Sequence, residues 1–153
     1  MPDVSGSNEQ DDHPVDLEAL CALCASALTA EGVPDAAEVS LLMVGTAEMA
    51  SLNVEHRGKQ GPTDVLSFTI DDVDDAADAE VILLGDLVIC PAVAATNAID
   101  HGVSLAAELE LLVVHGSLHL LGWDHEIDEE AEAMEARESD LLAKFGTAER
   151  SAR

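Results

Sequence analysis

Apolar positions along the chain recur with two periods, and each period predicts one kind of element. From Val15 to about Ala30 they return every three or four residues, which indicates a helix that Gly32 and Pro34 end. By the same pattern and by capping residues, further helices are expected from Thr46 to about His56, from Pro91 to about Asp100, from Ser104 through Leu120, and over residues 128–145.

Three short apolar runs bounded by turn residues predict strands over 38–45, 64–70 and 81–90, with Gly85 indicating a bulge or a close approach of another segment. The acidic stretch 71–80 between the last two is expected to be a turn or flap. The order is helix, strand, helix, strand, strand, then three helices. It predicts a single-domain α+β fold, in which helices cover a small mixed β-sheet.

The two ends differ in composition from the rest of the 153-residue chain. Residues 1–13 are polar and acidic, so we expect a disordered arm, followed by a folded domain over 14–146 and a tail over 147–153. We see neither a signal-peptide pattern nor an apolar run of about 18 residues. These features predict a cytoplasmic protein that does not enter a membrane.

Charge is very unevenly distributed, with 32 acidic against 6 basic residues and a net charge of −26. Such a surface repels nucleic acid, because affinity for RNA comes largely from Lys and Arg neutralising phosphates. Before residue 137 the chain has two cations, Arg57 and Lys59, both in the loop 57–63. We therefore expect this pair to be used for binding. The eight carboxylates between Glu126 and Asp140 are interpreted as a solvated helix face.

The three cysteines do not form a candidate metal site. Cys21 and Cys24 form one C-x-x-C within the first predicted helix, and Cys90 stands alone. A four-thiolate zinc site needs a second such pair. We expect Cys21 and Cys24 to be buried apolar residues.

The stretch "HGSLHLLGWDH" contains three candidate metal ligands. His115 and His119 are four apart, so a helix places both imidazoles on one face, within reach of one metal ion. Gly122 can end the helix and turn the chain back, which would return His125 as a third ligand. Three protein ligands leave one position open, as in catalytic zinc sites. Ligand type alone leaves nickel, copper and iron open.

Metzincin proteases share this spacing but place a catalytic glutamate after the first histidine. Here that position is Gly116, which has no side chain. A peptidase is therefore the weakest of the readings we consider.

Three segments together resemble the YbeY family of rRNA maturation factors. They are "HGSLHLLGWDH", "RGKQGPTDVLSF" and "LLGDLVICP", in the family's order. The resemblance implies one zinc ion per chain, held by His115, His119 and His125. It also implies a single-strand-specific endoribonuclease that matures the 3′ end of 16S rRNA and takes part in ribosome quality control. Arg57 matches the family's functionally important arginine. Trp123, Gln60, Gly61 and Thr69 depart from the family pattern.

The expected mechanism is metal-assisted attack on an RNA phosphodiester, with Arg57 and Lys59 binding phosphate. The general base stays open among Asp124, Asp64 and Asp86, although Asp124 fits better as a residue that orients a ligand or caps the turn. The expected partners are single-stranded rRNA and the small ribosomal subunit. A second reading is a non-catalytic zinc protein for ribosome assembly, whose acidic surface docks on basic ribosomal proteins.

Overall fold

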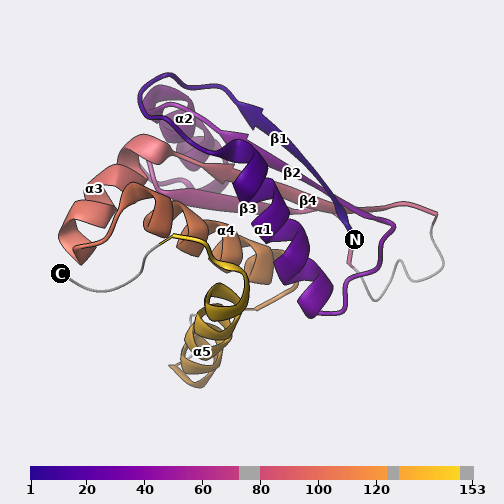
Figure 1. Ribbon diagram of the computed structural model, residues 1–153. Coiled ribbons are helices and arrows are strands. Elements are labelled where there is room, and N and C mark those ends of the chain that lie inside the picture. The colour runs from indigo at the N-terminus through magenta and orange to yellow at the C-terminus, as the bar shows by residue number, and fades with distance from the viewer. Residues whose placement is uncertain (73–79, 124–127, 149–153) are drawn as a thin grey trace.

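A four-stranded sheet organises the computed structural model, which describes residues 1–72, 80–123 and 128–148 (Figure 1). The strands β1 (Asp3–Asn8), β2 (Ala37–Met43), β3 (Val65–Thr69) and β4 (Ile82–Ile89) lie in the order β1-β2-β4-β3. β2 runs parallel to both β1 and β4, whereas β3 is antiparallel to β4. The predicted mixed sheet in an α+β fold is confirmed.

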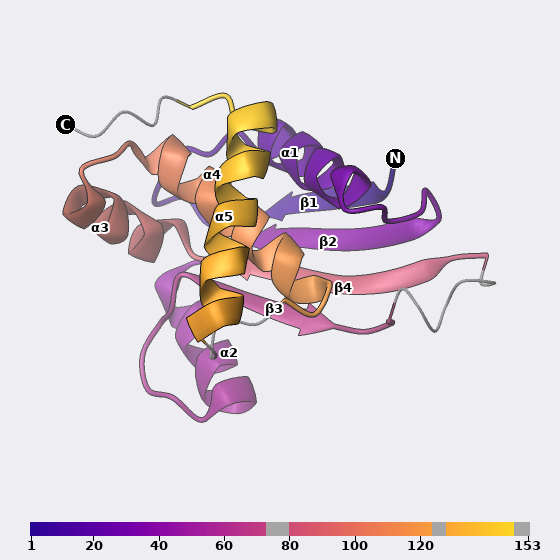
Figure 2. The ribbon, with the colours of Figure 1, turned by 90° about the horizontal axis from the view of Figure 1, so that it is seen from below.

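The described part of the chain also has five helices: α1 (Leu17–Ala30), α2 (Thr46–Arg57), α3 (Pro91–His101), α4 (Leu105–Leu120) and α5 (Asp128–Phe145). α1 and α4 pack on one face of the sheet, and α5 packs on α4 and α1 (Figure 2). α2 contributes to a smaller cluster on the opposite face, with Met49 against Val44, Leu66 and Val88. The main core therefore lies between the sheet and α1 and α4.

Helix ends follow the sequence signals with one exception. The Ser104 side chain caps α4 by accepting a hydrogen bond from the Ala107 N–H, and Gly102 ends α3 in the left-handed conformation. Thr46 was expected to cap α2, but it is the first residue of that helix, and Gly45 is the cap without a side-chain hydrogen bond.

The structure differs from the prediction of a disordered arm over residues 1–13. Asp3–Asn8 form β1, an edge strand paired in parallel with β2. Gly6 permits the close approach of this strand to α1, because a Cβ there would lie 2.7 Å from Cys21 Sγ. The side chains of β1 are mostly exposed, so its composition looks like that of a solvated arm while backbone pairing holds it in place.

The bulge expected at Gly85 is confirmed. The pairing register of β2 and β4 shifts between Glu38 and Val39, where Gly85 lies opposite. Gly85 has a φ of +154°, and a Cβ on it would lie 2.2 Å from the Phe68 carbonyl oxygen. Only glycine fits this approach of β3 to β4.

Among the described residues, no single helix is long and apolar enough to cross a membrane. α3 and α4 pass that test only as a pair joined across a 111° bend, and buried helices of soluble proteins pass it as well.

Candidate metal centre and phosphate groove

α4 brings His115 and His119 to one face, as their spacing predicted. Their Nε2 atoms lie 3.0 Å apart, and their rings meet edge to face with centroids 4.5 Å apart. A tetrahedral metal with bonds of about 2.0–2.1 Å separates its ligand nitrogens by roughly 3.3–3.4 Å. A small adjustment of the two rings would therefore let both nitrogens bind one ion.

The turn after this pair also forms as expected. Gly122 has a φ of +93°, and the N–H groups of Gly122 and Trp123 donate to the carbonyls of His119 and Leu118. These bonds satisfy the last carbonyls of α4 and redirect the chain. The third expected ligand, His125, lies outside the described residues, as does Asp124. No group of three metal-ligating side chains occurs within the described ranges.

Gly116 faces the sheet rather than the histidines. A Cβ at this position would lie 2.7 Å from Leu87 Cδ2 and 3.3 Å from Ser67 Oγ. The position that carries the glutamate in metzincins is thus one where α4 packs tightly against β3 and β4. A carboxylate has no space here, which is consistent with the low weight given to a peptidase.

Arg57 and the two histidines line one groove of about 610 Å³. The rest of its wall comes from the loop before β3 and from β3 itself, the edge strand: Thr63, Asp64, Val65, Leu66, Ser67, Phe68 and Thr69, with His56 beside Arg57. The structure therefore joins the two features that the sequence singled out, which lie more than fifty residues apart. Lys59 is exposed and is not among the described residues that line the groove.

The loop that carries Lys59 is tied to α2. Asn53 is buried, and its Nδ2 donates to the Gly61 carbonyl over 2.8 Å, while the Lys59 N–H donates to the Asn53 carbonyl. Gly58 ends α2 in the left-handed conformation, with a φ of +65°. Arg57 is thereby placed on the last turn of α2, at the rim of the groove.

The two described candidates for a general base, Asp64 and Asp86, differ in their relation to the groove, which only Asp64 lines. Asp64 accepts hydrogen bonds from the Val65 N–H at 2.8 Å and from Asn97 Nδ2 at 3.2 Å, so it joins the start of β3 to α3. Asp86 alternates with Leu87, which packs toward α4, and therefore faces the other side of the sheet. The hydrogen bonds of Asp64 and the orientation of Asp86 favour structural roles for these two carboxylates.

Glu138 is a site residue that the sequence analysis missed. Its Oε1 lies 2.6 Å from His115 Nδ1, although it belongs to α5. Glu138 was counted among the carboxylates of a solvated face. One signal distinguishes it: Glu138 is four residues after Met134 and three before Leu141, on the buried stripe of α5.

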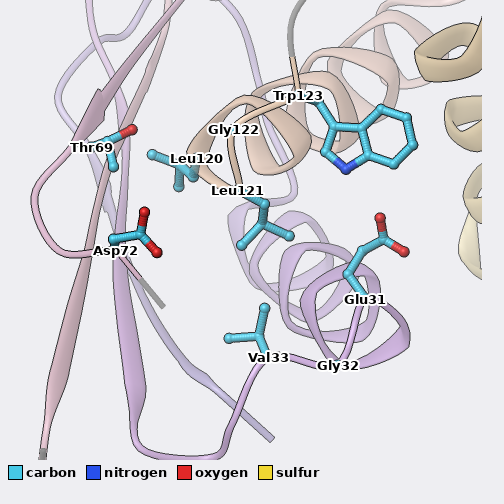
Figure 3. Close-up of a pocket in the computed structure, with 9 residues that line it drawn as sticks. All are labelled: Glu31, Gly32, Val33, Thr69, Asp72, Leu120, Leu121, Gly122 and Trp123. Carbon is cyan, nitrogen blue, oxygen red and sulfur yellow. The ribbon is translucent and has the colours of Figure 1, made fainter. Parts of the chain in front are cut away.

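A second cavity of about 310 Å³ lies at the end of α4 and shares Thr69 with the groove (Figure 3). Thr69 and Asp72 line one side of it, and Glu31 and Trp123 lie across from them (Figure 3). Trp123, one of the departures from the family pattern, therefore lines this second cavity. It is not among the described residues that line the groove with His115 and His119.

The family model described as Endoribonuclease YbeY matches residues 5–146. The chain belongs to the YbeY family of endoribonucleases. It is 48% identical over 139 residues to Endoribonuclease YbeY of Salinispora tropica, covering 86% of this chain and 88% of that protein. It is 44% identical over 152 residues to Endoribonuclease YbeY of Moorella thermoacetica, covering 94% and 97%.

The fold also matches a solved structure. The solution structure of TM1509 from Thermotoga maritima aligns with a TM-score of 0.60 at 24% identity, covering 93% of this chain and 91% of that one. The membership confirms the resemblance drawn from the three motifs. It also confirms the enzyme class at the level of the YbeY family, whose endoribonucleases hydrolyse phosphodiester bonds within RNA.

Proposed function

We propose that this chain is a zinc-dependent, single-strand-specific endoribonuclease that acts in the cytoplasm on the 3′ end of 16S rRNA and in ribosome quality control. The observation that supports the proposal most is the shared groove. Arg57, His115 and His119 all line this groove. His125 would complete the ligand set.

Different side chains of this chain have different roles in the proposed cleavage. His115 and His119 present imidazole nitrogens, the ligand type that suits zinc. A bound zinc ion supplies Lewis-acid polarisation of a phosphoryl oxygen or a water of lowered pKa. Arg57 binds a phosphate oxygen with its planar, permanently charged fork and stabilises charge that develops during cleavage. Lys59, on the exposed loop next to it, adds a second contact to the RNA backbone.

The acidic surface favours an additional interaction. With a net charge of −26, two Phe, one Trp and no Tyr, the molecule is a poor platform for stacking and neutralising free RNA. Docking on basic proteins of the small ribosomal subunit would bring the rRNA to the groove. The alternative reading, a non-catalytic assembly factor, keeps this docking and lacks the cleavage.

The test measures zinc content and cleavage of single-stranded RNA in a nuclease-free preparation. His119→Ala should lose both zinc and cleavage. Arg57→Ala should keep zinc and lose about 10²–10³-fold in kcat, the usual effect of removing one stabilising donor. Lys144→Ala, which removes an exposed cation from α5, is the matched control and should behave as the unmodified chain.

Chelator treatment distinguishes the endoribonuclease from the non-catalytic assembly factor. Multiple-turnover cleavage that is lost with chelator and restored by zinc supports the endoribonuclease. Full cleavage by either His119→Ala or Arg57→Ala would rule out the proposed mechanism. Association with small ribosomal subunits without zinc-dependent cleavage would favour the assembly factor.

A further inference from the structure

We propose that Glu138 is a positioning residue of the metal centre. It accepts a hydrogen bond from the His115 Nδ1–H and thereby fixes the imidazole that offers Nε2 to the metal. This inference rests on the proposed function, because it concerns the metal ion which that function requires.

The two ring nitrogens of His115 have different neighbours. His115 Nδ1 lies 2.6 Å from Glu138 Oε1, a distance typical of a short charge-assisted hydrogen bond. The Nε2 of the same ring lies 3.0 Å from His119 Nε2. An ionised carboxylate can only accept, so Nδ1 carries a proton, and in the neutral imidazole Nε2 then keeps its lone pair. The carboxylate thus selects the tautomer that can bind a metal.

Glu138 is itself held in place. Its side chain is 11% exposed, and the neighbouring Met134 and Leu141 are buried on the same stripe of α5. One residue earlier, Arg137 pairs with Glu31 over 2.7 Å and joins α5 to the end of α1. The position of the carboxylate relative to α4 is therefore set by helix packing rather than by a flexible surface side chain.

The other acidic residues of α5 are different. Six more carboxylates lie within Asp128–Phe145, and all six are exposed: Asp128, Glu129, Glu130, Glu132, Glu135 and Asp140. Burying a carboxylate costs free energy unless a partner compensates it. The imidazole of His115 is such a partner, which gives a physical reason for this one carboxylate to face inward.

Partners of this kind orient metal-bound histidines and make them more basic, and their loss usually weakens metal affinity 10–100-fold. The test compares Glu138→Gln, which keeps the shape and removes the charge, with Glu135→Gln, which removes one exposed charge from the same helix. Zinc affinity of the full, metal-stripped chain is measured by competition with a chelating indicator. We expect a 10–100-fold loss for Glu138→Gln and less than a twofold change for Glu135→Gln.

Two spectroscopic readouts separate positioning from a merely structural role. The Co²⁺ absorption spectrum of Glu138→Gln should differ from that of the unmodified chain, while Glu135→Gln should match it. Long-range ¹H–¹⁵N spectra of the metal-free, unmodified chain should show His115 with its proton on Nδ1. A proton mainly on Nε2, or equal zinc affinities in the two variants, would overturn the inference, and the tautomer readout decides even if Glu138→Gln does not fold.

The outcomes also distinguish this inference from the proposed function. An unmodified chain that binds zinc no more tightly than His119→Ala contradicts both. Zinc binding that depends on His119 but not on Glu138 contradicts the positioning role alone.

Discussion

Gly116 lies in the chain between His115 and His119, the proposed metal ligands, yet its surroundings are those of a packing residue. Leu87 and Ser67 leave no space for a side chain there. We predict that Gly116→Glu lowers the free energy of unfolding by more than about 3 kcal/mol, since it buries an unpaired charge. It should produce no peptidase activity. Urea unfolding measures the first effect and a peptide cleavage assay the second.

The control is Ala106→Glu, which adds the same charge at an exposed position of α4. Its effect should stay within about 0.5 kcal/mol. If Gly116→Glu were as stable as this control, the interpretation of Gly116 as a tightly packed position would be wrong.

Cys24 illustrates a residue whose environment was correctly predicted from the sequence. It is fully buried, and burial raises the pKa of its thiol to about 12. Burial also raises the pKa of Cys21, which is only partly buried. At pH 8 a thiol with a pKa near 12 is roughly 0.01% thiolate. We predict that iodoacetamide leaves Cys24 unmodified in the native protein and alkylates it in urea, as mass spectrometry can check.

Modification of native Cys24 at the rate found in urea would contradict this burial. It would also weaken the placement of α1 against α4, because the Cys24 thiol lies 3.3 Å from Ser117 Oγ.

Elements with strong local signals were predicted well. The last helix occupies the expected residues 128–145, and α4 begins after its Ser104 cap. β1 was missed because an edge strand with exposed side chains shows no apolar period, and its pairing with β2 is a contact between distant parts of the chain. Glu138 was missed for the same reason: only the packing of α5 on α4 brings it to His115. The period of apolar residues predicts helices and core strands. The pairing of β1 and the position of Glu138 depend instead on contacts between elements that are far apart in the sequence.

The junction of α3 and α4 provides a pH-dependent contact between elements. His101 Nδ1 lies 2.9 Å from Glu108 Oε1, and this hydrogen bond together with the carboxylate charge raises the pKa of His101. A group whose pKa is raised on folding stabilises the folded state below its unfolded pKa, about 6.5, and that contribution is lost as pH rises through the folded value. The effect is small because the His101 side chain is 56% exposed.

We predict that His101→Gln, which keeps a donor for Glu108 but does not titrate, lowers the melting temperature more at pH 5.5 than at pH 9. Thermal unfolding followed by circular dichroism measures the difference. A deficit that is equal at both pH values would show that the charge of His101 contributes nothing to this junction.

For the whole molecule, the charge distribution limits how RNA can bind. With 32 acidic residues and two cations near the groove, the contacts available to phosphates are few. Each phosphate neutralised on single-stranded RNA contributes about −0.7 to the slope of log K against log salt. Two contacts, through Arg57 and Lys59, therefore predict a slope of about −1.4. This slope is much shallower than that of a typical basic RNA-binding protein, which neutralises more phosphates.

Binding of a single-stranded oligonucleotide to the chelator-treated chain, measured by fluorescence anisotropy across salt concentrations, gives this slope. Arg57→Ala should bring it to about −0.7, whereas Lys144→Ala, at an exposed position of α5 that is not among the residues lining the groove, should leave it unchanged. A slope near −4 in the unmodified chain would mean that other cations contact the RNA, and the loop 57–63 would then not be the main phosphate contact. A shallow slope would mean that few phosphates are neutralised by the free protein, as expected if the proposed docking on basic ribosomal proteins supplies most of the affinity for the substrate.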